Sequence, residues 1–493
     1  MASARNVRGF GVASLAVVST AVLLWFGTGL SPCWPLPWFA PLPVLLLASS
    51  SSGRGTALAA ALSWLLGSLN LWHYFHGVGQ APVSLLIPFF GFPALAFALA
   101  VSLFRALLRR GAWRTALLAF PAFWVSFEYL VNALSVHGTA GSLSYSQLDF
   151  LPFLQVASLT GPWGLSFLVL LFPAALAIGR HLRGPAPKQA FRLAGAGLGV
   201  IALVLVFGAL RLARRTPAPR VKVGLVASDL PANINVAREG LQTARLFRDY
   251  AAEAASLADR GAQVIVLPEK LGVAADPEAG NMDAFFQSLA EKAQAVIVVG
   301  LIRISPPAKS NQARVYVPGA AVRSYDKHHL LPAFESKLKP GATLTLLSEP
   351  SGTWGVAICK DMDFTPLSRQ YGRAGAGLLL VPAWDFDLDR AWHSHMAMMR
   401  GVESGFSIVR AAKQGYLTVS DDRGRILAES RSDAAPFSTL VADVPVRHDV
   451  TLYLLLGDWF AWLALAALAF TLIQLCRLGR NAPTRRVSDA EVH

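Results

Sequence analysis

The sequence predicts a polytopic α-helical membrane bundle of seven spans plus one, with an α/β domain inserted before the last span. Hydrophobic residues make up 54% of the 493 residues and charged residues only 15%, whereas charged residues are about a quarter of an ordinary soluble protein. Several apolar stretches reach the length of about 20 residues that crossing a bilayer requires. Strand and helix patterns alternate only in the region between about 216 and 450.

The apolar stretches predict eight spans, which lie near residues 10–30, 34–49, 56–76, 83–104, 115–134, 151–178, 193–212 and 451–475. The second stretch is short and rich in proline. The segment between the seventh and eighth spans has a soluble composition and is long enough for one sizeable domain. We therefore expect a membrane domain at 1–215, an α/β domain at 216–450, and an eighth span with a basic tail at 451–493.

Charges between the spans predict the orientation of the chain. If the N-terminus is cytoplasmic, every inner segment carries Arg or Lys, whereas the outer loops 31–33, 77–82 and 135–150 carry neither. This positive-inside pattern places both termini in the cytoplasm and residues 216–450 on the extracytoplasmic face. The net charge of +14 then reflects topology. Nucleic-acid binding is disfavoured, because the basic residues do not form one stripe.

The inserted region shows strand patterns separated by helical ones. We expect strands at 221–227, 262–267, 295–301, 313–317, 320–325, 355–358 and 377–381, and helices at 236–260 and 282–293. Strands that alternate with helices predict a layered α/β domain with a buried central sheet. In such domains, functional side chains gather where strands end.

Three chemically useful side chains follow predicted strands: Glu269, Lys327 and Cys359. The other two cysteines, Cys33 and Cys476, lie in or beside hydrophobic segments. A thiol that attacks a carbonyl needs a base to take its proton and a cation to stabilise the oxyanion. Each residue alone has an ordinary interpretation: a solvated strand end, a surface turn and a small core residue, respectively. Together they predict a nucleophilic site.

Three segments resemble the signatures of the nitrilase, or carbon–nitrogen hydrolase, superfamily: LPEK at 267–270, YDKHHLLPAFE at 325–335 and GVAICKD at 355–361. The membrane segments FPAFWVSFEYL at 120–130 and LSYSQLDFLPFLQVASLTGPWGLSFLV at 143–169 narrow the resemblance. They look like segments of the apolipoprotein N-acyltransferase family, as does HSHMAMMRGVESGFSIVRAAKQG at 393–415. The resemblance covers nearly the whole chain.

This resemblance implies an α-β-β-α sandwich with a Glu-Lys-Cys triad and neither cofactor nor metal. Cys359 would carry the acyl group as a thioester, Glu269 would be the general base, and Lys327 would stabilise the oxyanion. Glu335 would hold the lysine in place. The donor would be a phospholipid and the acceptor the N-terminal amine of a diacylglyceryl-cysteine lipoprotein, at a bacterial inner membrane.

The chain departs from the family pattern beside the thiol. Lys360 and Asp361 stand where an aromatic residue and an acid are usual, and with Trp384 they are our candidates for substrate binding. Lys360 could lower the pKa of the thiol; alternatively it points to solvent or to a carboxylate. The segment between Lys327 and Cys359 is also short.

These departures leave other functions open. The main alternatives are a membrane-tethered amidase, in which water resolves the thioester, and a paralogue that acylates a different amine. The intact triad disfavours a catalytically silent scaffold. Arg400, Glu403 and Arg410 are expected to form a structural charge network. His393 and His395 are two residues apart, on different sides of a helix, which disfavours a metal pair.

Overall fold

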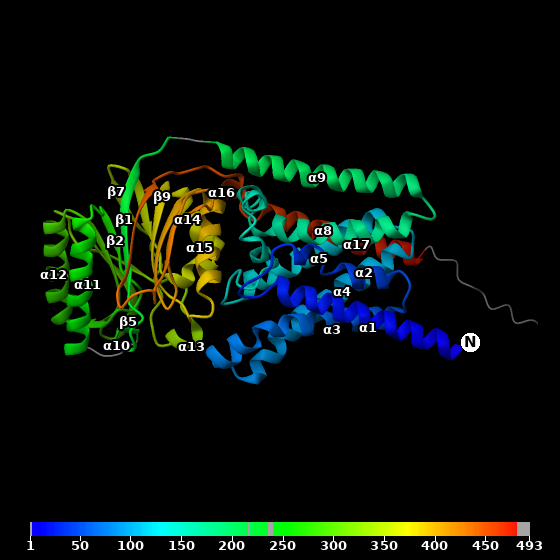
Figure 1. Cartoon of the computed structure of the whole chain (residues 1–493), viewed down its shortest axis with the longest axis horizontal. Helices are drawn as coiled ribbons and strands as arrows, with labels where there is room; N and C mark the ends of the chain where they lie inside the picture. The colour runs from blue at the N-terminus through cyan, green and yellow to red at the C-terminus, as the bar shows by residue number, and fades with distance from the viewer. Residues whose placement is uncertain (1, 215–216, 235–239, 481–493) are drawn as a thin grey trace, which may run out of the picture.

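The computed structural model describes residues 2–214, 217–234 and 240–480. A bundle of helices and an α/β domain lie next to each other along the longest axis of the molecule (Figure 1). The expected domain boundary at 215/216 and the part of the basic tail beyond residue 480 fall outside the described residues.

In the described part of the chain, six helices are long and apolar enough to cross a membrane. They are α1 (Ala2–Gly27), α4 (Val83–Leu108), α5 (Trp113–Leu134), α8 (Pro162–Leu182), α9 (Pro187–Ala213) and α17 (Trp459–Arg480). Each coincides with one of the predicted spans. The bundle is therefore confirmed as a set of membrane helices.

The other two predicted spans form shorter helices. Residues 34–49 hold the 3₁₀ turn η1 (Leu36–Trp38) and the short helix α2 (Leu42–Ala48), because prolines in this stretch remove backbone donors. Residues 56–76 hold most of α3 (Gly53–Ser68) and continue through η2 (Leu69–Leu71) into the π-helical turn η3 (His73–Val78). A total of eight spans stays a prediction.

Glycines interrupt two of the predicted spans at the ends that face the α/β domain (Figure 1). The turn η4 (Leu143–Gln147) and the short helices α6 (Leu151–Leu154) and α7 (Ala157–Thr160) precede α8, and α16 (Leu452–Leu456) precedes α17. Gly161 and Gly457 have φ of 63° and 64°, which glycine adopts without strain. A Cβ at Gly161 would also overlap the ring of Tyr453. These breaks place loops, and not continuous helix, next to the α/β domain.

The α/β domain contains two sheets packed face to face. One sheet has the order β13-β1-β2-β4-β5-β6, with β3 paired to β4, and the other has the order β12-β11-β10-β9-β8-β7. The strands of the two sheets, in chain order, are β1 (Arg220–Ala227), β2 (Val264–Val266), β3 (Val273–Ala275), β4 (Val296–Ser305), β5 (Ala308–Tyr316), β6 (Arg323–Asp326), β7 (Thr345–Glu349), β8 (Gly352–Val356), β9 (Ala376–Trp384), β10 (Ser407–Lys413), β11 (Tyr416–Ser420), β12 (Ile426–Arg431) and β13 (Ser438–Pro445). Buried residues of both sheets, such as Val264 and Leu379, form one core.

Helices cover the outer faces of both sheets. The helices α11 (Leu241–Asp259) and α12 (Glu278–Ala293) lie against the first sheet, and α14 (Thr365–Arg373) and α15 (Arg390–Ser404) lie against the second (Figure 1). The short helices α10 (Pro231–Ile234) and α13 (Pro332–Glu335) and the 3₁₀ turn η5 (Cys359–Asp363) lie in loops. This arrangement confirms the expected α-β-β-α sandwich.

The strands end at two opposite sides of the domain, and we call each of these sides an edge. Strands β8, β9 and β10 are parallel, as are β1, β2 and β4. Glu269, Lys327 and Cys359 follow β2, β6 and β8, and the backbone N–H of Glu269 bonds to Ala383 O at the end of β9. We call this the catalytic edge. Because β11 runs antiparallel to β10, the turn at 421–425 lies at the opposite edge.

Helix α15 joins the α/β domain to the membrane bundle. Its residues Met396, Met399 and Val402 belong to the hydrophobic core of the bundle, whereas Ala397 on the same helix packs into the core between the sheets. Hydrogen bonds cross the same boundary, including Tyr74 OH to Asp389 Oδ2 at 2.5 Å. The two parts therefore pack as one unit.

Candidate functional site

The three residues of the expected triad meet at the catalytic edge. Lys327 Nζ donates to Glu269 Oε1 at 2.8 Å and to Glu335 Oε2 at 3.0 Å. Glu269, Lys327 and Glu335 are each at most 2% exposed. The charge of Glu269 and that of Lys327 both act on the Cys359 thiol. A buried base and a buried cation thus lie beside a half-buried nucleophile.

Local backbone contacts fix the position of Glu269 and Lys327. A Cβ on Gly300 of the neighbouring strand β4 would overlap Pro268 O and lie 2.6 Å from Glu269 Cα, so only glycine leaves room for this turn. Lys327 N bonds to Asn311 O at 2.8 Å, which ties the lysine to strand β5.

Cys359 lies at a sharp turn after β8. Its φ is 41°, a left-handed conformation that is uncommon for residues other than glycine and that often occurs at functional sites. The Asp361 carboxylate accepts a hydrogen bond from Ile358 N at 3.0 Å and stabilises this turn. The thiol Sγ donates to Trp384 O at 3.4 Å. The turn therefore aims the thiol at the end of β9.

Burial and neighbouring charges shift the pKa values of the cluster residues in different directions. Burial, and after it the charge of Glu269, raises the pKa of the Cys359 thiol. Burial alone would lower the pKa of Lys327, but the carboxylates of Glu269 and Glu335 outweigh it, and the pKa lies above its ordinary value. Burial opposes ionisation of Glu335, yet Lys327 and Lys270 lower its pKa to about 2. The resting site holds a neutral thiol beside a charged lysine.

Two residues of the cluster were not identified from the sequence. Asn311 Nδ2 donates to Glu269 Oε1 at 2.5 Å and to Glu335 Oε1 at 2.7 Å. Lys270 forms an ion pair with Glu335. Lys270 could have been predicted as a member of the cluster, because it directly follows Glu269 in the LPEK segment. Nothing in the sequence around Asn311 marks it, because only the pairing of β4 with β5 brings it to this edge.

Two of the candidate substrate-binding residues make contacts within the protein. Lys360 Nζ donates to Asp363 Oδ2 at 2.8 Å and lies 3.3 Å from His137 Nδ1. The carboxylate of Asp361 is fully buried and accepts from Tyr325 OH at 2.7 Å as well as from Ile358. The sequence left open whether Lys360 lowers the pKa of the thiol or points to solvent or to a carboxylate. The structure supports the last of these, since Lys360 bonds to Asp363. Substrate contact by Lys360 or Asp361 stays a prediction.

Trp384, the third candidate, lies next to the thiol. Its carbonyl accepts from Cys359, and its indole Nε1 donates to Gln414 Oε1 at 2.8 Å. Lys413 Nζ lies 3.9 Å from the centre of the ring, and burial lowers the pKa of this lysine to about 7. A substrate role for Trp384 also stays a prediction.

The remaining charges pair within the domain. The expected network of Arg400, Glu403 and Arg410 consists of two pairs: Arg400 with Glu403 at 2.9 Å, and Arg410 with Asp385 at 2.5 Å. The charge of Arg410 also acts on the Cys359 thiol, so this residue lies closer to the site than its position in the sequence indicated. His393 and His395 bind different carboxylates: His393 bonds to Asp389, and His395 lies against Asp149 and Glu429.

Comparisons with known proteins agree with this architecture. Residues 20–175 match the apolipoprotein N-acyltransferase N-terminal domain, and residues 226–446 match the carbon-nitrogen hydrolase domain. A protein from Geobacter metallireducens named apolipoprotein N-acyltransferase is 27% identical, over 92% of this chain and 94% of its own. One of the same name from Vibrio cholerae is 26% identical, over 88% and 92%. Among solved structures, an amidase from Nesterenkonia sp. is 20% identical, covers 47% of this chain and 93% of its own, and gives a TM-score of 0.40.

Proposed function

This chain belongs to the apolipoprotein N-acyltransferase family, and from that premise we propose that Cys359 carries a fatty acyl group between two membrane-anchored substrates. The donor is a phospholipid, and the acceptor is the N-terminal amine of a diacylglyceryl-cysteine lipoprotein. The observation that carries this proposal is the buried Glu269–Lys327–Glu335 cluster beside the thiol. No cofactor is required for the chemistry.

In the first step, Cys359 Sγ attacks the ester carbonyl carbon of the phospholipid, and Glu269 takes the thiol proton. The C–O bond of the ester then breaks, and the lysophospholipid leaves with the proton from Glu269. The raised pKa of the thiol supports this assignment, because a thiol that stays protonated at neutral pH needs a base at the moment of attack.

Lys327 stabilises the negative oxygen that develops on the carbonyl. Its raised pKa keeps the ammonium charged, and its two carboxylate partners hold it in one place. A charge fixed in advance in a buried site stabilises a transition state far more than the same charge would in water. Glu335, Asn311 and Lys270 are positioning residues for this arrangement.

In the second step, the amine of the lipoprotein attacks the thioester carbonyl carbon. Glu269 accepts a proton from the amine, the C–S bond breaks, and the Cys359 thiolate recovers that proton. The product is an amide, and the enzyme returns to its starting state. The same base and the same cation thus serve both halves of the reaction.

The orientation of the chain follows from where the substrates lie. We propose that both termini are cytoplasmic and that the α/β domain lies outside a bacterial inner membrane, where both lipids are anchored. The inner segments carry the arginines, as the positive-inside rule requires. The start of α1 and the end of α17 lie at the end of the bundle away from the α/β domain (Figure 1), which supports this topology.

A carbon–nitrogen hydrolase is the second candidate, because residues 226–446 match that domain. In this alternative water, and not an amine, attacks the thioester, and a free acid leaves. A third possibility is acyl transfer to a different amine. All three pass through a Cys359 thioester. The two acyltransferases form it from an ester, whereas the hydrolase forms it by breaking an amide C–N bond, with release of an amine.

Purified full-length protein, incubated with phospholipid and a diacylated lipopeptide, tests the proposal. We expect a triacylated lipopeptide by mass spectrometry, and restored growth when the gene is expressed in a strain depleted of its own acyltransferase. Free fatty acid without an amide product would show the hydrolase instead. Consumption of phospholipid with acylation of another added amine would show the paralogue.

A further inference from the structure

A second lipid-facing site lies at the edge of the domain opposite the catalytic edge. Here a groove with a volume of about 340 Å³ opens between the end of α9, helix α7, the turn at 421–425 and the connection from β13 to α16. Three arginines line it: Arg211, Arg214 and Arg423. None of these residues belongs to the Cys359 cluster.

The topology separates this groove from the thiol. Cys359, Trp384 and Lys413 follow or end the parallel strands β8, β9 and β10, whereas Arg423 follows β11, which runs back antiparallel. Asp449 bonds through its N–H to Gly405 O, just before β10 begins. The groove and the thiol are therefore separated by the length of the strands, which rise about 3.3 Å per residue.

Positive charge exceeds negative charge in the groove. Arg211 and Arg423 both approach Asp449 Oδ2, at 3.1 and 3.2 Å, so two guanidinium groups share one carboxylate oxygen there. Arg423 also pairs with Asp422 at 3.0 Å. Arg214 is exposed at the mouth of the groove. Arg423 is 3% exposed and Arg211 also donates to Gln155 Oε1 at 2.6 Å, so Arg214 supplies the accessible guanidinium, which suits a phosphate group because it binds through paired hydrogen bonds.

The rim of this groove is apolar. Leu210 is 67% exposed and Val450 is 58% exposed, and both line it. Arginines surrounded by exposed aliphatic side chains at the end of a membrane helix are suited to the boundary between head groups and hydrocarbon. A soluble anion would not require the apolar rim.

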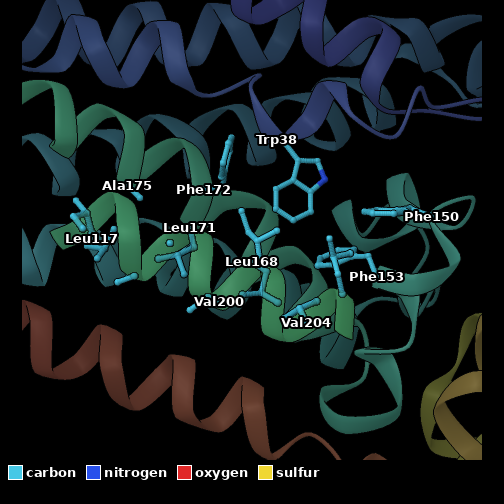
Figure 2. Close-up of a pocket in the computed structure, with 15 residues that line it drawn as sticks. Trp38, Leu117, Phe150, Phe153, Leu168, Leu171, Phe172, Ala175, Val200 and Val204 are labelled. Atoms are coloured by element: carbon cyan, nitrogen blue, oxygen red, sulfur yellow. The ribbon is translucent and has the colours of Figure 1, made fainter. Parts of the chain in front are cut away.

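A second, apolar groove lies on α9 nearer its start, and the two are separated where the buried Gly208 packs against Pro152. It has a volume of about 160 Å³ and lies between α8 and α9, with Phe153, Leu168, Val200 and Val204 on its walls (Figure 2). Gly197, Val204 and Arg211 are spaced seven residues apart and therefore share a face of α9. Glycine at 197 keeps this part of α9 free of a side chain, and a Cβ there would meet no atom within 4 Å.

We propose that this side of α9 binds an anionic glycerophospholipid of the outer leaflet. The phosphate lies against Arg211, Arg214 and Arg423, and an acyl chain lies in the groove between α8 and α9. The site is separate from the donor site at Cys359, and it fixes the α/β domain against the bilayer at the edge away from the chemistry. Lipid binding here does not depend on acyl transfer.

The test uses full-length Cys359→Ala protein in detergent, so that no bound lipid is consumed. Dioleoyl phosphatidylglycerol and dioleoyl phosphatidylcholine are titrated separately and followed by native mass spectrometry. We expect phosphatidylglycerol to bind more tightly, and Arg214→Gln to weaken it roughly fivefold, the effect of about one basic residue at a membrane surface. Arg214→Glu should weaken it further. Arg192→Gln makes the same charge change at an exposed position near the other end of α9 and should have no effect.

A second pair of variants tests whether an acyl chain lies in the groove between α8 and α9. Gly197→Leu places a side chain in the groove and should weaken phosphatidylglycerol binding several-fold. Gly195→Leu adds the same side chain to the same helix but outside the groove lining and should not. A Cβ at either glycine meets no neighbour, so both variants should fold.

Three results would overturn the proposal. The first is equal binding of phosphatidylglycerol by the wild type and by both Arg214 variants. The second is equal affinity for the two lipids. The third is displacement of phosphatidylglycerol by inorganic phosphate at millimolar concentration, which would mark a site for free anions and not for a lipid.

Discussion

The two edges of the α/β domain use charge in opposite ways. At the catalytic edge, Lys327 is buried between two carboxylates, and every charge in the cluster has an opposite charge in contact. At the opposite edge, Arg211 and Arg423 are also paired, with Asp449 and Asp422, but Arg214, the third arginine of the groove, is exposed. Chemistry requires charges that are fixed before the substrate arrives, whereas binding of a charged head group requires charges that remain accessible. Substitutions should therefore affect turnover strongly at the first edge, and lipid affinity modestly at the second.

The largest effect is expected at the nucleophile. Cys359→Ala should lower turnover at least about 10³-fold, because no other group can carry the acyl chain, and Cys359→Ser should retain little activity. Turnover is measured as the rate of formation of triacylated lipopeptide. Cys476→Ala, which removes an exposed cysteine of α17, is the matched control and should remain fully active. Full turnover by Cys359→Ala on any acyl substrate would rule out the thiol mechanism.

The next largest effect is expected at the cation. Lys327→Met removes the charge that faces the oxyanion and should lower kcat by roughly 10²- to 10³-fold. It also leaves the carboxylates of Glu269 and Glu335 with less compensation, so the midpoint of thermal unfolding should fall. Lys309→Met, at an exposed position on β5, controls for the loss of a lysine. An unchanged kcat with a lowered unfolding midpoint would assign Lys327 a purely structural role.

Glu335 should affect both activity and the dependence of stability on pH. Its pKa of about 2 in the folded state lies below its ordinary value of 4.5. The ionised carboxylate therefore stabilises the fold above about pH 4.5, and this contribution is lost as the pH falls toward 2. Glu335→Gln should lower kcat by up to about 100-fold through displacement of Lys327, and its unfolding temperature should depend less on pH in the acid range.

Thermal unfolding in detergent between about pH 3 and 7 measures this dependence. Glu291→Gln, at an exposed position on α12, should unfold with the same pH dependence as the wild type. The same acid sensitivity in Glu335→Gln and the wild type would contradict the pairing of Glu335 with Lys327 and Lys270.

The smallest effect at this edge is expected for Asn311, which orients the two carboxylates without carrying charge. Asn311→Ala removes hydrogen bonds to Glu269 and Glu335 and should lower kcat by about tenfold, as a loss of about 1.4 kcal/mol in the transition state would. The Michaelis constant should stay close to that of the wild type. An increase in the Michaelis constant with an unchanged kcat would instead place Asn311 in substrate binding.

The sequence was sufficient for features that depend on local pattern. Six of the predicted spans follow from long runs of apolar residues, and the strand ends at Glu269 and Cys359 follow from short apolar runs that stop at a charged or reactive side chain. The stretch at 34–49 was less predictable, because its prolines shorten the helices. Strands β3, β7, β10, β11, β12 and β13 were not predicted; in β7 (Thr345–Glu349) only two of the five residues are apolar.

Features that depend on pairing between distant segments could not be predicted. Asn311 reaches the site only through the register of β4 and β5, and the charge of Arg410, which is 51 residues after Cys359, acts to lower the pKa of the thiol. Lys360 directly follows the nucleophile, but the turn at Cys359 directs its side chain to Asp363 and His137. Adjacency in sequence was therefore a poor guide to the contacts of the Lys360 side chain.

The central claim is that Cys359 carries the acyl group, and trapping of the intermediate tests it most directly. Full-length protein is incubated with phospholipid in the absence of any amine acceptor, then quenched in acid and analysed by peptide mass spectrometry. We predict one fatty acyl group on the peptide that contains Cys359, released by hydroxylamine at neutral pH and transferred when the lipopeptide is added. Formation of triacylated product while Cys359 remains unmodified under these conditions, or acylation of Cys33 or Cys476 instead, would contradict the account.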